Sequence, residues 1–353
     1  MNNETKTITA DLAEWMPCVY EQDDWQEAVP ASLREPAQQI AGATAESFEV
    51  VLALVLTFFG VQLRGRRRIY DHRGKSISPE LNLLLVHPEK ALSISWYEMV
   101  CDTLVRRDTN EHSFIGMLSP GVPTKVNGFA HFARESQILS EVTPYEILRK
   151  LKLGEMPVAF LHSTATALED ELNRLTRLEK KNLSRILNLS WNKDRVGTGK
   201  EAFAAGVGLL WAIDGDELEA ALPAFYQSNK PAPVLLLNST ANREKPPRES
   251  LSALLNLQDD IWQILDGEPL VISPTPKSAE NLLSFAGVFE DELRHLPSKA
   301  GRRNLGFIPG LCYRIVCLLA PFADRDEETL ITAAKGMTGA LARRHFSTLH
   351  KLT

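Results

Sequence analysis

Cysteine is scarce in this 353-residue chain, and its four cysteines are either far apart or five positions apart. They are Cys18, Cys101, Cys312 and Cys317. No pair has the C-x-x-C spacing of the common zinc sites, so the sequence predicts no metal centre. Such a low cysteine content also excludes a disulfide-stabilised scaffold and indicates a reducing compartment, the cytoplasm.

Long apolar runs are lacking too. The longest, "VVLALVLTFFGV" at 50–61, has 12 residues, whereas a membrane span needs roughly 20. We therefore expect a buried helix there and no membrane partner. An excess of positive charge is also absent, because 39 basic residues face 45 acidic ones and give a net charge of -6. This balance provides no overall attraction to nucleic acid, although a local basic patch is compatible with it.

Short apolar runs alternate with longer amphipathic segments through the middle of the chain. Each run is apolar on both faces, as strands of a parallel sheet are when helices cover both sides. The alternation predicts an α/β core with a mostly parallel sheet. Strands are expected at 81–86, 113–118, 157–162, 206–212 and 233–238, with helices at 95–107, 143–151, 167–189 and 216–226.

The two ends of the chain have a different pattern, which predicts three regions. Residues 1–75 form a helical N-terminal region, with one helix from about Leu33, a second over 46–63 that could stop at Gly60, and a short hairpin strand at 67–70. Residues 76–245 form the α/β core. Residues 246–353 form a helical C-terminal region in which no strand is expected. Its helices are predicted at 251–265, 278–295, 307–319 and 327–350.

The strand at 81–86 leads into a loop and then a helix, which is where a phosphate-binding loop would lie. A Walker A loop reads G-x-x-x-x-G-K-[ST], because glycine amides wrap the phosphates, the lysine neutralises them and the hydroxyl binds Mg²⁺. Here Val86 and Ala91 replace the glycines and Leu92 replaces the lysine, so only Ser93 remains. Glu89 adds a negative charge. The sequence therefore predicts no bound nucleotide or other cofactor at this loop.

Other parts of a nucleotide site are weak or missing. The segment "VGTGKEAF" at 196–203 contains G-T-G-K but lacks the first glycine, the hydroxyl residue and a preceding strand. The strand at 157–162 ends in His162 and Ser163, and the strand at 233–238 ends in Asn238, where a Walker B strand would carry an acid. An alternative is a repurposed site in which His87 and His162, both at strand ends, bind a metal or act as a base.

Three segments give the chain a resemblance to a known family. "VPASLREPAQQIAGATAESFEVVLALVLTFFGVQLRGRRRI" resembles a helical lead-in, and "ELNLLLVHPEKALSISWYEMV" resembles the strand, loop and helix of a phosphate site without its Gly and Lys. "GFIPGLCYRIVCLLAPF" resembles a late helix that reads K-x-P-G-x-x-x-R. Pro309, Gly310 and Arg314 match it, and Phe307 stands in place of the lysine. Over about residues 29–351 the chain resembles P-loop ATPase domains of phages, plasmids and mobile elements that accompany primases and helicases.

The resemblance implies a RecA- or AAA-like core, a setting in mobile-element DNA processes, and a place for Ser93 and Arg314 in a remnant nucleotide site. With the loop residues lost, we expect a catalytically inactive binding or scaffold module with protein partners. One alternative is an active NTPase with an atypical or subunit-completed site. A second is ATP-independent DNA binding through the basic residues, which are Arg64, Arg66, Arg67, Arg68, Arg343 and Arg344.

Overall fold

The fold is given by a computed structural model. It describes residues 24–63, 67–71, 73–87, 96–97, 99–100, 103, 138–139, 158–163, 176–192, 206–215, 218, 233–240, 245–266, 270–295, 302, 305–323 and 326–350. The expected strand at 113–118 and helix at 143–151 lie outside the described residues, as do most of the expected helices at 95–107 and 216–226.

A short helical segment and two helices open the described chain: η1 (Trp25–Ala28), α2 (Ala31–Thr44) and α3 (Phe48–Leu63). Residues 50–56, 58 and 59 of α3 are almost completely buried, as the all-round apolar pattern of this helix requires. Gly60 does not end α3, because the helix continues to Leu63. A Cβ at Gly60 would lie 2.5 Å from the carbonyl oxygen of Pro79, so the glycine allows α3 to approach the chain that leads into the sheet.

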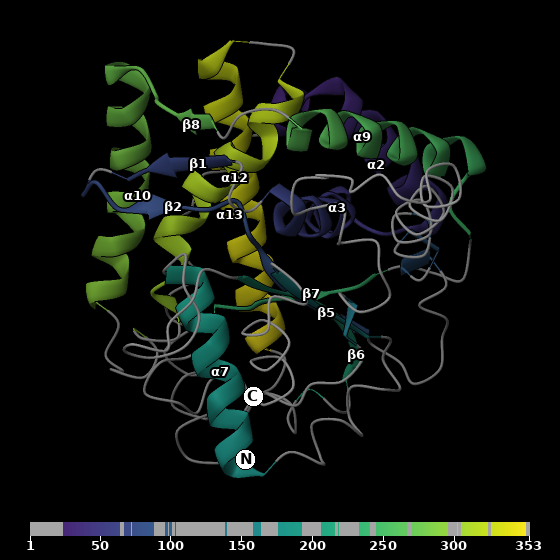
Figure 1. Cartoon of the computed structure of the whole chain (residues 1–353), viewed down its shortest axis with the longest axis horizontal. Coiled ribbons are helices and arrows are strands. Elements are labelled where there is room, and N and C mark those ends of the chain that lie inside the picture. The colour runs from purple at the N-terminus through teal and green to yellow at the C-terminus, as the bar shows by residue number, and fades with distance from the viewer. Residues whose placement is uncertain are drawn as a thin grey trace, which may run out of the picture.

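Among the described residues, the core is a sheet of five strands in which every strand pair is parallel. Its spatial order is β4 (Ile138–Leu139), β5 (Val158–Ser163), β6 (Gly206–Asp214), β3 (Asn82–His87) and β7 (Leu235–Asn238). β3 is buried along its whole length, and α3 packs against β3 and β6 (Figure 1). The expected α/β class with a mostly parallel sheet is thus confirmed.

A second sheet has three strands, in the order β2 (Ser76–Ile77), β1 (Arg67–Tyr70) and β8 (Leu270–Ile272). β1 pairs antiparallel with β2, which confirms the expected hairpin strand, and parallel with β8. β8 lies in the C-terminal region where only helices were expected, and that expectation was wrong. Three residues are too few to show a strand period, and their partner strand lies about two hundred positions earlier in the chain.

Helices dominate the C-terminal region, as the sequence predicts. They are α9 (Arg248–Asp266), α10 (Pro276–His295), η4 (Ile308–Gly310), α12 (Leu311–Leu319), η5 (Ala320–Phe322) and α13 (Glu327–His350). α7 (Arg177–Asn192), the described part of the helix expected at 167–189, packs against β6. α13 packs against β7, η1 and α12, so the first and last parts of the described chain share one core. Among the described helices, none combines the length and apolar character that crossing a bilayer requires.

Candidate functional site

The carboxyl ends of β3, β6 and β7 lie side by side, and ligands of open parallel sheets bind at this edge. In the strand register His87 is opposite Asp214, and Val86 is opposite Asn238. Val86 and His87 are buried. Ala91, Leu92 and Ser93, the rest of the predicted loop, lie outside the described residues. The edge therefore has an imidazole, a carboxylate residue and an amide residue at the ends of three adjacent strands.

His162 does not share this level of the sheet. It is opposite Leu210, which is itself opposite Leu83, four residues before His87. A strand rises about 3.3 Å per residue, so the two histidines are offset by roughly 13 Å along the strands. They also lie on strands separated by β6. The structure thus does not bring His87 and His162 together for a shared metal or base site.

Asp214 was missed by sequence reasoning, which ended this strand at residue 212. The signal was present as an apolar run followed by acids, "LLWAIDGDE". β6 continues to Asp214, which stands at the carboxyl edge.

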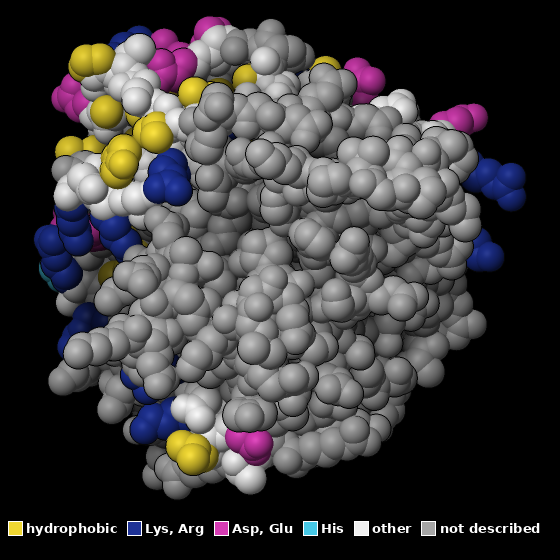
Figure 2. Space-filling model, in the orientation of Figure 1, with side chains coloured by type: hydrophobic (Ala, Val, Ile, Leu, Met, Phe, Trp, Pro, Cys, Tyr) yellow, Lys and Arg dark blue, Asp and Glu magenta, His cyan; other side chains and the backbone are white. Residues whose placement is uncertain are grey.

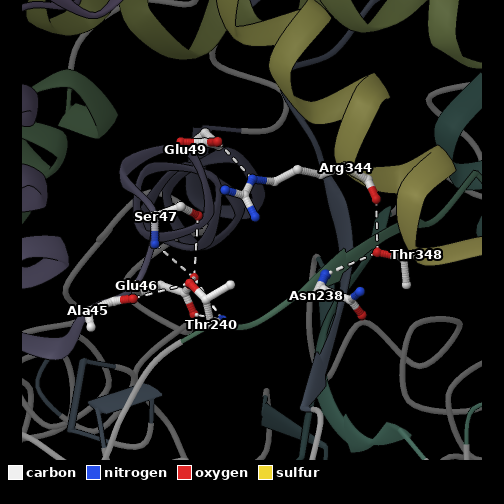
Figure 3. A network of polar contacts seen from close by, with 8 residues as sticks. All are labelled: Ala45, Glu46, Ser47, Glu49, Asn238, Thr240, Arg344 and Thr348. Carbon is white, nitrogen blue, oxygen red and sulfur yellow. Dashed lines mark hydrogen bonds and ion pairs between the residues drawn. The ribbon is translucent and has the colours of Figure 1, made fainter. Parts of the chain in front are cut away.

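A buried carboxylate, Glu46, lies next to this edge (Figure 3). It accepts hydrogen bonds from the hydroxyl of Ser239, from the N–H (3.1 Å) and hydroxyl (3.0 Å) of Thr240, and from the N–H of Ser47 (2.8 Å). In each of these bonds Glu46 is the acceptor, which is the pattern of an ionised carboxylate. The N–H of Ser239 in turn donates to the carbonyl of Val86 (2.8 Å). Ser239 directly follows the last residue of β7, so Glu46 binds the chain immediately beyond the paired ends of β3 and β7.

The turn between α2 and α3 positions Glu46. Ala45 ends α2 in the left-handed region, with φ of 54°, which few residues other than glycine adopt. The Thr240 hydroxyl has one proton, which it shares between Glu46 and the carbonyl of Ala45 (3.1 Å), and so holds this turn against β7. No sequence signal indicated Glu46, because an acid just before an apolar helix ordinarily serves the helix N-terminus. Its actual partner lies 193 positions later in the chain.

The outer edge of β7 is covered by side chains of α13. The N–H of Leu236 donates to Nδ1 of His345 (2.9 Å). The N–H of Asn238 donates to the Thr348 hydroxyl (3.1 Å), as Figure 3 shows. His345 is fully buried between Phe307 and Phe346, and this burial lowers the pKa of His345 to about 3. The imidazole is therefore neutral at physiological pH and acts as a fixed hydrogen-bond acceptor.

Arg314 lies at the opposite end of the sheet from the predicted phosphate loop. Its Nη1 donates to the carbonyl of Ser78 (2.7 Å), just before β3, and its Nη2 donates to the carbonyl of Trp191. Its Cζ lies 3.5 Å from the centre of the Trp191 ring. Arg314 lines a cavity of about 360 Å³ at the amino ends of the strands. Arg314 is thus far from Val86, the first residue of the predicted degenerate loop, and Ser93, its companion in the predicted remnant site, lies outside the described residues.

The predicted basic clusters lie on separate elements. Arg67 and Arg68 belong to β1 in the smaller sheet, whereas Arg64 and Arg66 lie outside the described residues. Arg343 and Arg344 are half-buried on α13. Nε of Arg344 lies 2.7 Å from Oε1 of Glu49 in an ion pair (Figure 3), so a contact from Arg344 to a phosphate would compete with Glu49.

Nucleophilic cysteine chemistry and clustered metal ligands are not indicated in the described part of the chain. Burial raises the pKa of Cys312 and of Cys317 to about 12, so both thiols are protonated and unreactive. Among the described residues, no three histidine, cysteine, aspartate or glutamate side chains are grouped as a metal would need.

No family model matches the chain, and no curated protein matches it significantly.

Proposed function

We propose that this chain is a catalytically silent relative of P-loop ATPases that acts as a binding or scaffold module. It would assemble with protein partners in a DNA process of a phage or other mobile element, as the family resemblance implies. The single observation that carries the proposal is the buried Glu46 carboxylate beside the end of β3, next to the point where an ATPase would hold triphosphate.

The strand order supports the ancestry in this proposal. Numbered along the chain, the five strands of the larger sheet lie in the order 5-1-4-3-2, with β3 as strand 1. Among the described strands, β3, which leads into the predicted loop, is therefore central, with β6 and β7 on either side. Rossmann and flavodoxin-like sheets have different orders.

Electrostatic repulsion supports the proposal that the chain no longer binds a nucleoside triphosphate. The segment that follows β3 has neither the glycines nor the lysine of a phosphate loop, and it contains Glu89. Two like charges about 6 Å apart repel each other by about 3 kcal/mol at an effective dielectric constant of about 20. Each phosphate charge brought that close to Glu46 would meet this cost, and the phosphate-binding lysine position is occupied by Leu92, although Lys90 in the spacer balances the charge of Glu89.

The test is calorimetry of the full chain with ATP in the presence of Mg²⁺ and in the presence of EDTA, together with an assay of phosphate release. We expect no Mg²⁺-dependent binding up to millimolar ATP and no hydrolysis. Saturable, Mg²⁺-dependent binding that is lost in Ser93→Ala but kept in the neighbouring control Ser95→Ala would overturn the proposal and indicate an active, atypical NTPase.

A further inference from the structure

α7 is anchored to the molecule by one face, and its opposite face is open to solvent. The helix packs against β6, and its buried residues are Leu183, Ser184, Ile186, Leu187 and Trp191. The opposite face carries Leu178, Lys181 and Arg185, which are all exposed and follow one another at spacings of three and four residues. Figure 2 shows Lys and Arg side chains along the lower left flank of the molecule, where Figure 1 places α7.

The open face is basic, and the single acidic residue of the helix does not neutralise it. That acid is Glu179, whereas the basic residues of α7 are Arg177, Lys180, Lys181 and Arg185. The Glu179 carboxylate accepts both the hydroxyl and the N–H of Thr176 (2.7 Å each), and these hydrogen bonds lower the pKa of Glu179. Three and four residues after Glu179 the helix has Asn182 and Leu183, so this acid has no basic neighbour at the spacing of a helical ion pair.

The positions of the basic residues work against the stability of the helix. Lys181 and Arg185 lie four residues apart, a spacing at which like charges repel. Within the described residues, neither of them has a hydrogen-bond or ion-pair partner. Arg177 and Lys180 belong to the first turn, where the positive end of the helix dipole disfavours cations. Such an arrangement is unfavourable in the free protein and favourable in a complex with an anionic partner.

The charges are spaced for a polyanion. Four residues of helix rise by about 6 Å, which separates Lys181 from Arg185 along the axis, and Arg177 precedes Lys181 by the same step. Every nucleic acid presents phosphates at regular intervals, and Lys and Arg bind them without reading a base. An acidic protein would need carboxylates placed to match. Leu178, 65% exposed beside the two cations, adds an apolar side chain of the kind that nucleic-acid-binding proteins place against sugars and bases.

We propose that the exposed face of α7 binds the sugar–phosphate backbone of a nucleic acid duplex, with Lys181 and Arg185 as phosphate contacts. The contact is independent of sequence, because neither side chain has to reach a base edge. None of the basic residues predicted from the sequence as nucleic-acid contacts belongs to this helix. The inference adds a direct contact with nucleic acid to the proposed function, and it rests neither on Mg²⁺ nor on the segment after β3.

The experiment is fluorescence anisotropy of a labelled DNA duplex of about 20 base pairs with the full chain in EDTA, at salt concentrations from about 50 to 200 mM. A matched RNA duplex distinguishes the two sources of such a backbone. We expect saturable binding at the lowest salt concentration. The double variant Lys181→Gln, Arg185→Gln should bind about tenfold or more weakly, and its plot of log affinity against log salt should be shallower by about 2, the slope of two lost phosphate contacts.

Two control variants separate a local contact from net charge. Lys245→Gln with Arg248→Gln removes two exposed cations at the start of α9, and it should leave the affinity within about twofold and the salt slope unchanged. Lys181→Arg with Arg185→Lys keeps both charges of α7 and should retain the wild-type salt slope.

Three results would overturn the inference. The first is the absence of saturable binding of either duplex at the lowest salt concentration. The second is an unchanged affinity and salt slope in the Lys181→Gln, Arg185→Gln variant. The third is a polyglutamate peptide that displaces the labelled duplex as well as unlabelled duplex of equal charge does, which would assign this face to acidic chains in general. ATP binding is not measured in any of them, so failure here is distinguishable from failure of the silent-ATPase proposal.

Discussion

Nδ1 of His345 accepts the backbone N–H of Leu236 at 2.9 Å, so a helix side chain occupies the place where a sixth strand would pair. Leu236 and Asn238 are two residues apart on β7, and their N–H groups meet His345 and Thr348, three residues apart on α13. In a strand, residues two apart have the same orientation, so both N–H groups point to the same edge of the sheet. In a helix, side chains three apart lie on the same face, so His345 and Thr348 can both reach that edge. The last helix thereby closes the outer edge of the sheet.

This contact predicts a loss of stability in mild acid. The pKa of His345 is about 3 in the folded protein against an ordinary 6.5, so the unfolded chain takes up a proton first as the pH falls. The His345 contribution is fully present above about pH 6.5 and is lost as the pH falls toward 3. We expect about 2 kcal/mol lower unfolding free energy from this residue at pH 5 than at pH 7.5.

Urea unfolding at both pH values measures this effect. His345→Leu should be less stable than wild type at pH 7.5 by about 1 to 3 kcal/mol, because the buried Leu236 N–H loses its acceptor. The unfolding free energy of His345→Leu should fall less between pH 7.5 and pH 5 than that of the wild type. The exposed His295, replaced by Gln, serves as the control and should keep the wild-type decline. An unchanged pH dependence in His345→Leu would show that the imidazole is not the titrating group.

Glu46→Gln should destabilise the protein by about 2 kcal/mol. The amide has one acceptor oxygen and a donor group, whereas the carboxylate receives donors from Ser47, Ser239 and Thr240 on both of its oxygens. The shift of the urea midpoint measures the effect. Glu35→Gln, at an exposed position on α2, should lie within about 0.5 kcal/mol of wild type. Equal midpoints for the two variants would refute a structural role for the Glu46 carboxylate.

Gly336→Ala should destabilise the contact between α13 and η1. A Cβ at Gly336 would collide with Cβ and Cγ of Trp25. Because the Trp25 Cβ moves only with its backbone, η1 must shift away from α13, at a cost of about 1 to 3 kcal/mol. Gly287→Ala on α10 is the matched control, because nothing lies within 4 Å of its Cβ position. It should be neutral or more stable by up to about 1 kcal/mol, as alanine favours a helix.

A double mutant separates the Gly336 clash from a general effect on the helix. In a Trp25→Gly background, Gly336→Ala should cost less than in the wild type, because the Cβ and the ring with which it would collide are both gone. Thermal unfolding of the four proteins gives the comparison. Additive costs would mean that the two residues do not contact each other.

Local sequence patterns were sufficient to predict several of the longer helices and the central strand. α9, α10 and α13 follow from helical periodicity over many residues, and β3 follows from a short run of apolar residues. β8 could not be recognised, because a strand of three residues has too few side chains to show a period. The strand order could not be predicted from periodicity either, because pairing between segments that are far apart in the sequence does not change the local residue pattern.

The candidate sites were predictable only in part. The absence of the phosphate-loop residues is readable along the chain, whereas Arg314 was singled out only by the family resemblance. The contacts of Arg314 with Ser78 and Trp191 join positions 236 and 123 residues away, which no spacing rule indicates. Glu46 was overlooked for the same reason. Its hydroxyl partners come from the end of β7, and an acid in such a place looks ordinary in the sequence.

The closure of β7 by α13 has a consequence for synthesis. Leu236 leaves the ribosome 109 residues before His345, its acceptor. At about 5 to 20 residues per second, that gap lasts roughly 5 to 20 seconds. During this interval the apolar strand Leu235–Asn238 presents an open edge that a neighbouring nascent chain could pair with. The cover of this strand edge is thus one of the last contacts that the growing chain can form.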